Sequence, residues 1–135
     1  MNSAIEIHDS VVDAVSDLDG TAALYFSSVY MHKSLGRPGV DPGTGWVQKA
    51  KLRIADATIK STLSHFPGKL LDGFLRLGNS IFDNEIPISL NFRGDTELRL
   101  DSWNDRVILI SGRGVELELI DEPTYVEDFR PDATV

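Results

Sequence analysis

Apolar and polar residues alternate with a period of two over much of the chain. In residues 46–54 every second position is Trp, Gln, Ala, Leu or Ile, and the positions between hold Val, Lys, Lys and Arg. The same alternation appears in residues 86–93, 97–101 and 115–119. Successive side chains of a β-strand point to opposite faces, so this pattern predicts strands with one apolar and one solvated face. Such strands are typical of antiparallel sheets.

Residues that favour turns separate these runs. Asp or Asn beside Gly adopts the left-handed backbone conformations that tight turns require. Such sites lie at Asp19-Gly20, Gly78-Asn79 and Gly94-Asp95, and the pairs Asp83-Asn84 and Asn104-Asp105 are further turn signals. After residue 78 they recur roughly every ten residues, a spacing typical of sandwiches and barrels. We therefore predict an all-β fold, an antiparallel β-barrel or compact two-sheet β-sandwich of about 9–11 strands with little helix.

The pattern places the strands within a single domain of residues 1–135, whose last residues, 131–135, we expect to fray. Residues 10–18 also carry apolar residues at helical spacing behind a possible N-cap, so a short helix is the alternative there. Gly112 and Gly114 predict a bulge or sharp bend. The expected strands are Ala4–His8, Ser10–Leu18, Thr21–His32, Gly45–Ile54, Thr58–Ser64, Gly73–Leu77, Ile86–Arg93, Thr96–Asp101, Arg106–Ser111 and Gly114–Ile120, with a last short strand at Thr124–Phe129.

The apolar positions of these strands define the expected core, because one face of each strand must be shielded from water. The predicted core residues are Ile5, Ile7, Leu24, Phe26, Trp46, Leu52, Ile54, Leu75, Leu90, Phe92, Leu100, Leu109, Leu117 and Leu119.

Residues 34–45 form a glycine-rich segment that cannot continue a strand. The segment holds four glycines and two prolines in twelve residues, and strands are expected on both sides of it. Proline lacks an N–H donor and glycine weakens a strand, so we predict an ordered loop at the rim of the fold. Loops held on a rigid scaffold often carry function.

The strands beside this loop supply the candidate binding residues. They are Tyr30, His32, Arg37, Trp46 and Gln48. The ends of β-barrels commonly hold a ligand between apolar walls and a few polar groups, so we predict that these side chains converge on a small-molecule site.

The composition narrows the classes of function. The chain has a formal net charge of −8, which argues against nucleic-acid binding because that depends on Lys and Arg. The charge is uneven: residues 1–68 hold 7 acids and 6 bases, and residues 69–135 hold 14 acids and 7 bases. The longest apolar run, residues 22–26, is far shorter than the roughly 20 residues of a membrane helix. We therefore expect no membrane partner, and an acidic surface that can meet a basic protein partner.

Catalytic and cofactor motifs are missing from the sequence. It contains no Cys, no Gly-x-Ser-x-Gly, no Gly-x-Gly-x-x-Gly and no P-loop pattern. The three histidines, His8, His32 and His65, are not at the spacing of a zinc helix. We therefore assign no catalytic residue, no metal ligand and no cofactor. The absence of Cys and of a signal-like N-terminal segment favours the cytoplasm.

Three hypotheses of function follow. The first is a non-catalytic cytosolic interaction or accessory domain, able to form a homodimer through an edge strand or sheet face. The second is a small-molecule-binding β-barrel, or an enzyme, with its site at the rim formed by residues 34–45. The third is a cupin-like metal-dependent enzyme, which requires His8 and His32 to lie close together beside a carboxylate.

Overall fold

The computed structural model describes residues 1–60 and 68–131, and within them it contains nine strands and no helix. This confirms the predicted all-β, antiparallel fold. The strands are β1 (Asn2–Leu18), β2 (Thr21–Ser34), β3 (Gly43–Ala55), β4 (Thr58–Ile59), β5 (Gly68–Leu77), β6 (Ser80–Asp83), β7 (Glu85–Ile88), β8 (Asn91–Ser102) and β9 (Val107–Phe129).

Six of the strands pair in a ring. Each strand is antiparallel to the next in the order β1-β2-β3-β9-β8-β5, and β5 returns to β1. Among the described residues, this last contact joins Val11 with Lys69 and Val12 with Gly68, and the ring of strands is not a regular barrel. Outside the ring, β6 pairs with β5, β7 with the first part of β1, and β4 with β9.

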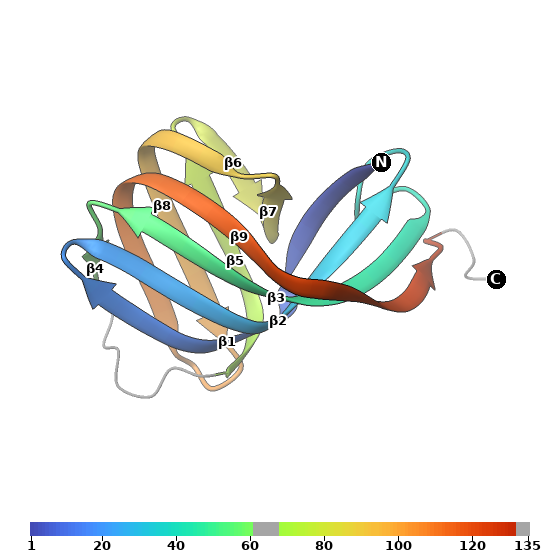
Figure 1. The fold of residues 1–135 in the computed structure, drawn as a ribbon, viewed down its shortest axis with the longest axis horizontal. Coiled ribbons are helices and arrows are strands. Elements are labelled where there is room, and N and C mark those ends of the chain that lie inside the picture. Colours follow the sequence, from blue (N-terminus) through green and yellow to red (C-terminus); the bar gives the residue numbers. More distant parts are fainter. Residues whose placement is uncertain (61–67, 132–135) are drawn as a thin grey trace.

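The ring forms a broad body, and four of its strands continue into a narrower extension that we call the wing (Figure 1). The N-terminus and the end of β9 lie at the wing, and β1, β2, β3 and β9 run through body and wing alike (Figure 1). The wing consists of residues 2–6 of β1, 29–34 of β2, 43–47 of β3, 85–88 (β7) and 124–129 of β9.

Register shifts mark the junction between body and wing on all four strands. They fall between Glu6 and Val11 on β1, between Phe26 and Val29 on β2, and between Val47 and Lys49 where β3 meets β9. An extra residue in one strand bends the strand and increases its twist. The aligned irregularities therefore turn the wing away from the axis of the body.

Strand boundaries differ from the prediction where a strand bends or changes partner. The expected strands Ala4–His8 and Ser10–Leu18 are one strand, β1, and residues 10–18 are not helical. The expected strand Ile86–Arg93 is divided, because β7 pairs with β1 whereas β8 pairs with β5 and β9. The last three expected strands form one long strand, β9. Most of the expected strand Thr58–Ser64 and of the tail 131–135 lies outside the described residues.

Most of the predicted core residues are buried in one cluster inside the body and at its junction with the wing. Leu24, Leu52 and Leu75, for example, are fully buried, and Trp46 packs against the cluster from its edge. Two assignments are wrong. Leu109 does not point into the core, because its neighbours Ile108 and Ile110 do. Leu119 is 37% exposed, because it lies beyond the part of β9 that pairs with β8.

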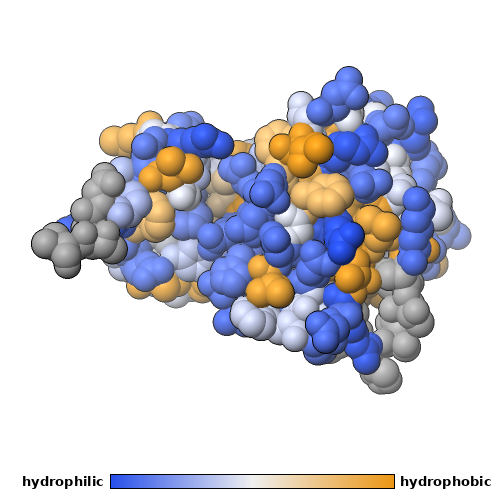
Figure 2. Space-filling model, turned by 180° about the vertical axis from the view of Figure 1, so that it is seen from behind, coloured by the Kyte–Doolittle hydropathy of each residue, from blue (hydrophilic) through white to orange (hydrophobic). Residues whose placement is uncertain are grey.

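The rear face of the molecule is mainly polar. Figure 2 shows hydrophilic residues over most of the rear face, with apolar residues in several small groups. No helix in the described part of the chain is long and apolar enough to cross a membrane.

Candidate functional site: a pocket over His32

The register of the wing places the candidate residues on defined faces. Directly opposed residues of neighbouring strands share a face. His32 is opposite Ala4 on one side and Gly45 on the other. In the next row, Tyr30 is opposite Glu6 and Val47. His32, Tyr30 and Glu6 therefore lie on the same face of the wing.

Residues 35–42 of the predicted loop connect two strands and fold back over His32, whereas Ser34 belongs to β2 and residues 43–45 belong to β3. Gly39 has a φ of 80°, which favours glycine, and a Cβ there would lie 3.4 Å from His32 Cδ2. The loop is ordered by its own hydrogen bonds. The Ser34 hydroxyl donates to the Pro42 carbonyl at 2.8 Å, and the Arg37 amide donates to Asp41 Oδ2 at 2.6 Å. These bonds hold the shape of the loop, in which Gly39 lies next to the imidazole.

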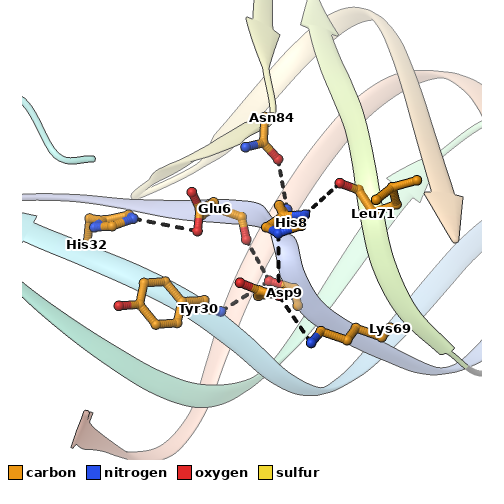
Figure 3. Close-up of polar contacts among 9 residues, drawn as sticks. Glu6, His8, Asp9, Tyr30, His32, Lys69, Leu71 and Asn84 are labelled. Atoms are coloured by element: carbon orange, nitrogen blue, oxygen red, sulfur yellow. Dashed lines mark hydrogen bonds and ion pairs between the residues drawn. The ribbon is translucent and has the colours of Figure 1, made fainter. Parts of the chain in front are cut away.

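His32 is buried without a hydrogen-bond partner. Its exposed fraction is 6%, and the rings of Tyr30 and Phe129 meet it edge-on at centroid distances of 5.1 and 4.8 Å. Neither ring nitrogen makes a hydrogen bond within the described structure. The Nε2 atom lies 3.7 Å from Glu6 Oε2, too far for a hydrogen bond (Figure 3). Buried polar atoms are nearly always paired, so these two nitrogens are exceptional among the described residues.

A pocket of about 160 Å³ opens beside this imidazole. It lies between the wing, the glycine-rich loop and the turn from β6 to β7. Its lining is mostly polar, with carboxylates, an amide, the imidazole and one guanidinium. The lining residues are Ala4, Ile5, Glu6, His32, Arg37, Pro38, Gly39, Val40, Asp83, Asn84 and Glu85.

Tyr30 forms a fixed contact next to the pocket. Its hydroxyl donates a hydrogen bond of 2.5 Å to Glu127 Oε1 at the end of β9. Burial raises the pKa of Tyr30 above its ordinary value of 10.0, and the hydrogen bond to Glu127 and the nearby carboxylates of Glu6 and Asp9 raise it further. The phenol is therefore protonated at neutral pH and can donate this hydrogen bond. The bond connects β2 with the end of β9 across β3.

The structure separates the five predicted site residues into two groups. His32 and Arg37 line the pocket, and Tyr30 packs against His32. Trp46 and Gln48 are opposite Met31 and Val29, which places them on the other face of the wing. There Trp46 packs on Tyr125 at 5.4 Å and under the Lys33 ammonium at 4.5 Å. The convergence predicted for Trp46 and Gln48 is wrong, because adjacent residues of β2 and β3 alternate in face.

His8 and His32 belong to different surroundings. Figure 3 shows them on opposite sides of Glu6. His8 Nδ1 lies 2.8 Å from the Leu71 carbonyl, and its Nε2 is 3.5 Å from Asp9, because the backbone bends at Asp9 with a φ of 72°. Within residues 1–60 and 68–131, no three His, Asp or Glu side chains form a group that can hold a metal ion.

Glu6, Asn84 and Glu85 are pocket residues that the sequence pattern does not single out. Glu6 stands between Ile5 and Ile7 as an ordinary polar position of an alternating strand. Glu85 reaches the pocket only because β7 pairs with β1, a contact between segments about eighty residues apart. An alternation pattern carries no information about such a pairing.

Comparison of the chain with protein-family models, curated proteins and solved structures finds no match in any of the three. What the pocket binds therefore has to follow from its geometry.

Proposed function

We propose that this chain is a non-catalytic binding domain that holds a small polar molecule in the His32 pocket. The buried imidazole without a hydrogen-bond partner carries this proposal. A polar ligand in the pocket would satisfy His32 and recover the free energy lost when the imidazole left water. The glycine-rich loop would cover the ligand from above.

The composition of the lining suits the binding of polar groups. The pocket residues include one imidazole, one guanidinium, one amide and three carboxylates, which recognise polar groups by hydrogen bonds and charge.

Protein-observed NMR tests this function. Small amines, carboxylates, amides and polyols are titrated into the labelled full chain while the His32 ring and the Gly39 amide are followed. We expect at least one class to give saturable shifts at both positions. The proposal is wrong if no class does so.

Two variants separate binding from general perturbation. His32→Leu retains an apolar side chain at the position and removes both nitrogens, so saturable shifts at Gly39 should disappear. His32→Gln restores a polar group in a similar space and should recover part of the affinity. Ligand shifts that persist unchanged in His32→Leu would place the site elsewhere. Circular dichroism checks that each variant is folded.

A second candidate function is docking of an extended, basic segment of another protein on β9. From Glu118 to Phe129, this strand pairs with β3 on one side, and no described strand covers its other side. The Leu117 amide donates outward to the Leu90 carbonyl at 3.0 Å, so by alternation the Leu119 backbone also points outward. Free strand edges accept added strands, and the exposed acids Glu122 and Glu127 favour a basic one.

Peptide binding tests this second function. A peptide of alternating Lys and Val should bind to the full chain, whereas a Glu–Val peptide should not. Leu119→Pro removes an outward N–H donor and should weaken the binding of the Lys–Val peptide. A homodimer through this edge in analytical ultracentrifugation would contradict the basic partner and support self-association instead.

For either function we retain the cytoplasm as the proposed location, because the chain has no Cys.

A further inference from the structure

Two carboxylates oppose each other across the strands at the His32 pocket. Glu6 of β1 and Glu85 of β7 are register partners, and both line the pocket. Directly opposed side chains share a face, with Cβ atoms about 4.5–5.5 Å apart. Like charges in this arrangement repel each other and destabilise the sheet. A cation placed between the two carboxylates would replace this repulsion with attraction.

His32 lines the same pocket and lies beside Glu6. Its Nε2 atom faces Glu6 Oε2 at 3.7 Å and has no hydrogen-bond partner. With only 8% of its side chain exposed, bulk water cannot satisfy it. In the neutral tautomer with the proton on Nδ1, Nε2 accepts a hydrogen bond. Glu6, Glu85 and His32, which can each supply an acceptor, therefore line one pocket.

We infer that the pocket binds the ammonium group of a small primary amine, an assignment that rests on the proposed binding function. An ammonium group has three N–H donors, a positive charge and no acceptor, which suits a pocket lined by carboxylates and by an imidazole without a hydrogen-bond partner. The pocket volume of about 160 Å³ is well below the roughly 300–1,000 Å³ of ordinary ligand sites, so the amine is small.

Arg37 extends this assignment to the rest of the ligand. It lies on the loop that borders the pocket, and its guanidinium is suited to bidentate contact with a carboxylate. An amine that also carries a carboxylate, such as a small amino acid, would be held at both ends.

Three probes of similar size test the inference on the wild-type full chain by isothermal calorimetry and NMR. They are propylamine, β-alanine and propionate. Propylamine and β-alanine should bind at His32, and propionate should not. Arg37→Gln should weaken the binding of β-alanine relative to that of propylamine, because only β-alanine carries a carboxylate for the guanidinium. Equal binding of propionate and propylamine would overturn the inference.

Charge-neutral variants test the two carboxylates. Glu6→Gln and Glu85→Gln should each lower the affinity for propylamine by about tenfold, because each removes a charged hydrogen-bond acceptor. Glu122→Gln removes the same charge from an exposed residue outside the pocket and should have no effect. Equal weakening by Glu122→Gln would show non-specific attraction and contradict the inference. If other fragments bind at His32 but amines do not, the proposed function stands and this inference fails.

Discussion

At the scale of single residues, Gly45 shows why the wing has its shape. A Cβ at this position would overlap the hydroxyl of Tyr30. The missing side chain therefore lets the Tyr30 ring lie across β3 and reach Glu127 at the end of β9. The same ring contacts His32, so one small residue helps to orient the candidate site.

The raised pKa of Tyr30 predicts a loss of stability at alkaline pH. A group whose pKa is higher in the folded state contributes stability below its unfolded pKa, here 10.0, and loses it as the pH rises through the folded value. Above pH 10 the unfolded chain ionises Tyr30 while the folded chain keeps it protonated. We expect the free energy of unfolding to fall more steeply above pH 10 in wild type than in Tyr30→Phe.

Urea denaturation at several pH values measures this difference. Tyr25→Phe is the matched control, because it removes another phenol from β2 while leaving the Tyr30–Glu127 hydrogen bond in place. The assignment is contradicted if the alkaline slope of Tyr30→Phe equals that of wild type.

At the scale of elements, β9 shows how one strand changes its inward face. In the first part of β9, the even-numbered residues Ile108 and Ile110 point into the core. Further along the strand, the odd-numbered residues Val115 and Leu117 point inward instead. The change falls at Gly112 and Gly114, opposite the register shift between Arg93 and Thr96 of β8. The glycines therefore mark the irregularity that the sequence predicts there.

This inward assignment gives a prediction for the stability of β9. Ile110 is fully buried, so Ile110→Ala should lower the free energy of unfolding by roughly 2–5 kcal/mol through lost burial and a cavity. Leu119 is 37% exposed, and Leu119→Ala should cost less than about 1 kcal/mol. Chemical denaturation of both variants measures the two values. Similar losses in both would contradict the assigned faces.

At the scale of the whole molecule, the uneven charge along the chain is partly balanced in space. The acids after residue 115 lie on β9 beside the basic positions of β3. Arg53 contacts Glu118 at 2.7 Å and Glu116 at 3.5 Å, and Lys49 lies 3.9 Å from Asp121. The acidic residues at the end of the sequence therefore do not form a separate acidic surface. Because some of them pair with bases of β3, fewer acidic side chains are free to contact a partner than the sequence indicates.

Reversing the charge of Arg53 tests whether these ion pairs between β3 and β9 stabilise the fold. Arg53→Glu would face Glu116 and Glu118 with a like charge, and we expect a loss of about 1 kcal/mol that shrinks as salt is added. Arg53→Gln removes the attraction without adding repulsion and should lose less. Thermal unfolding at low and high salt measures both effects. A loss that does not depend on salt would indicate a packing effect instead.

The sequence by itself determined the fold class and much of the core. Alternation sets which side of each strand is apolar, and this local property predicts Leu24 and Leu52 as buried residues. It also located the glycine-rich loop, because Gly and Pro act on the backbone at their own positions. His32 and Arg37 follow from that loop, and both line the pocket.

Tertiary structure decided which residues share a face and which strands meet. The pairing of β7 with β1 brings Glu85 opposite Glu6, and register alone places Trp46 and Gln48 on the face away from His32. A shift of one residue moves every side chain of a strand to the opposite face, and strand order depends on contacts between distant segments. For this reason the period of the sequence identifies the strands, whereas only their assembly creates the pocket.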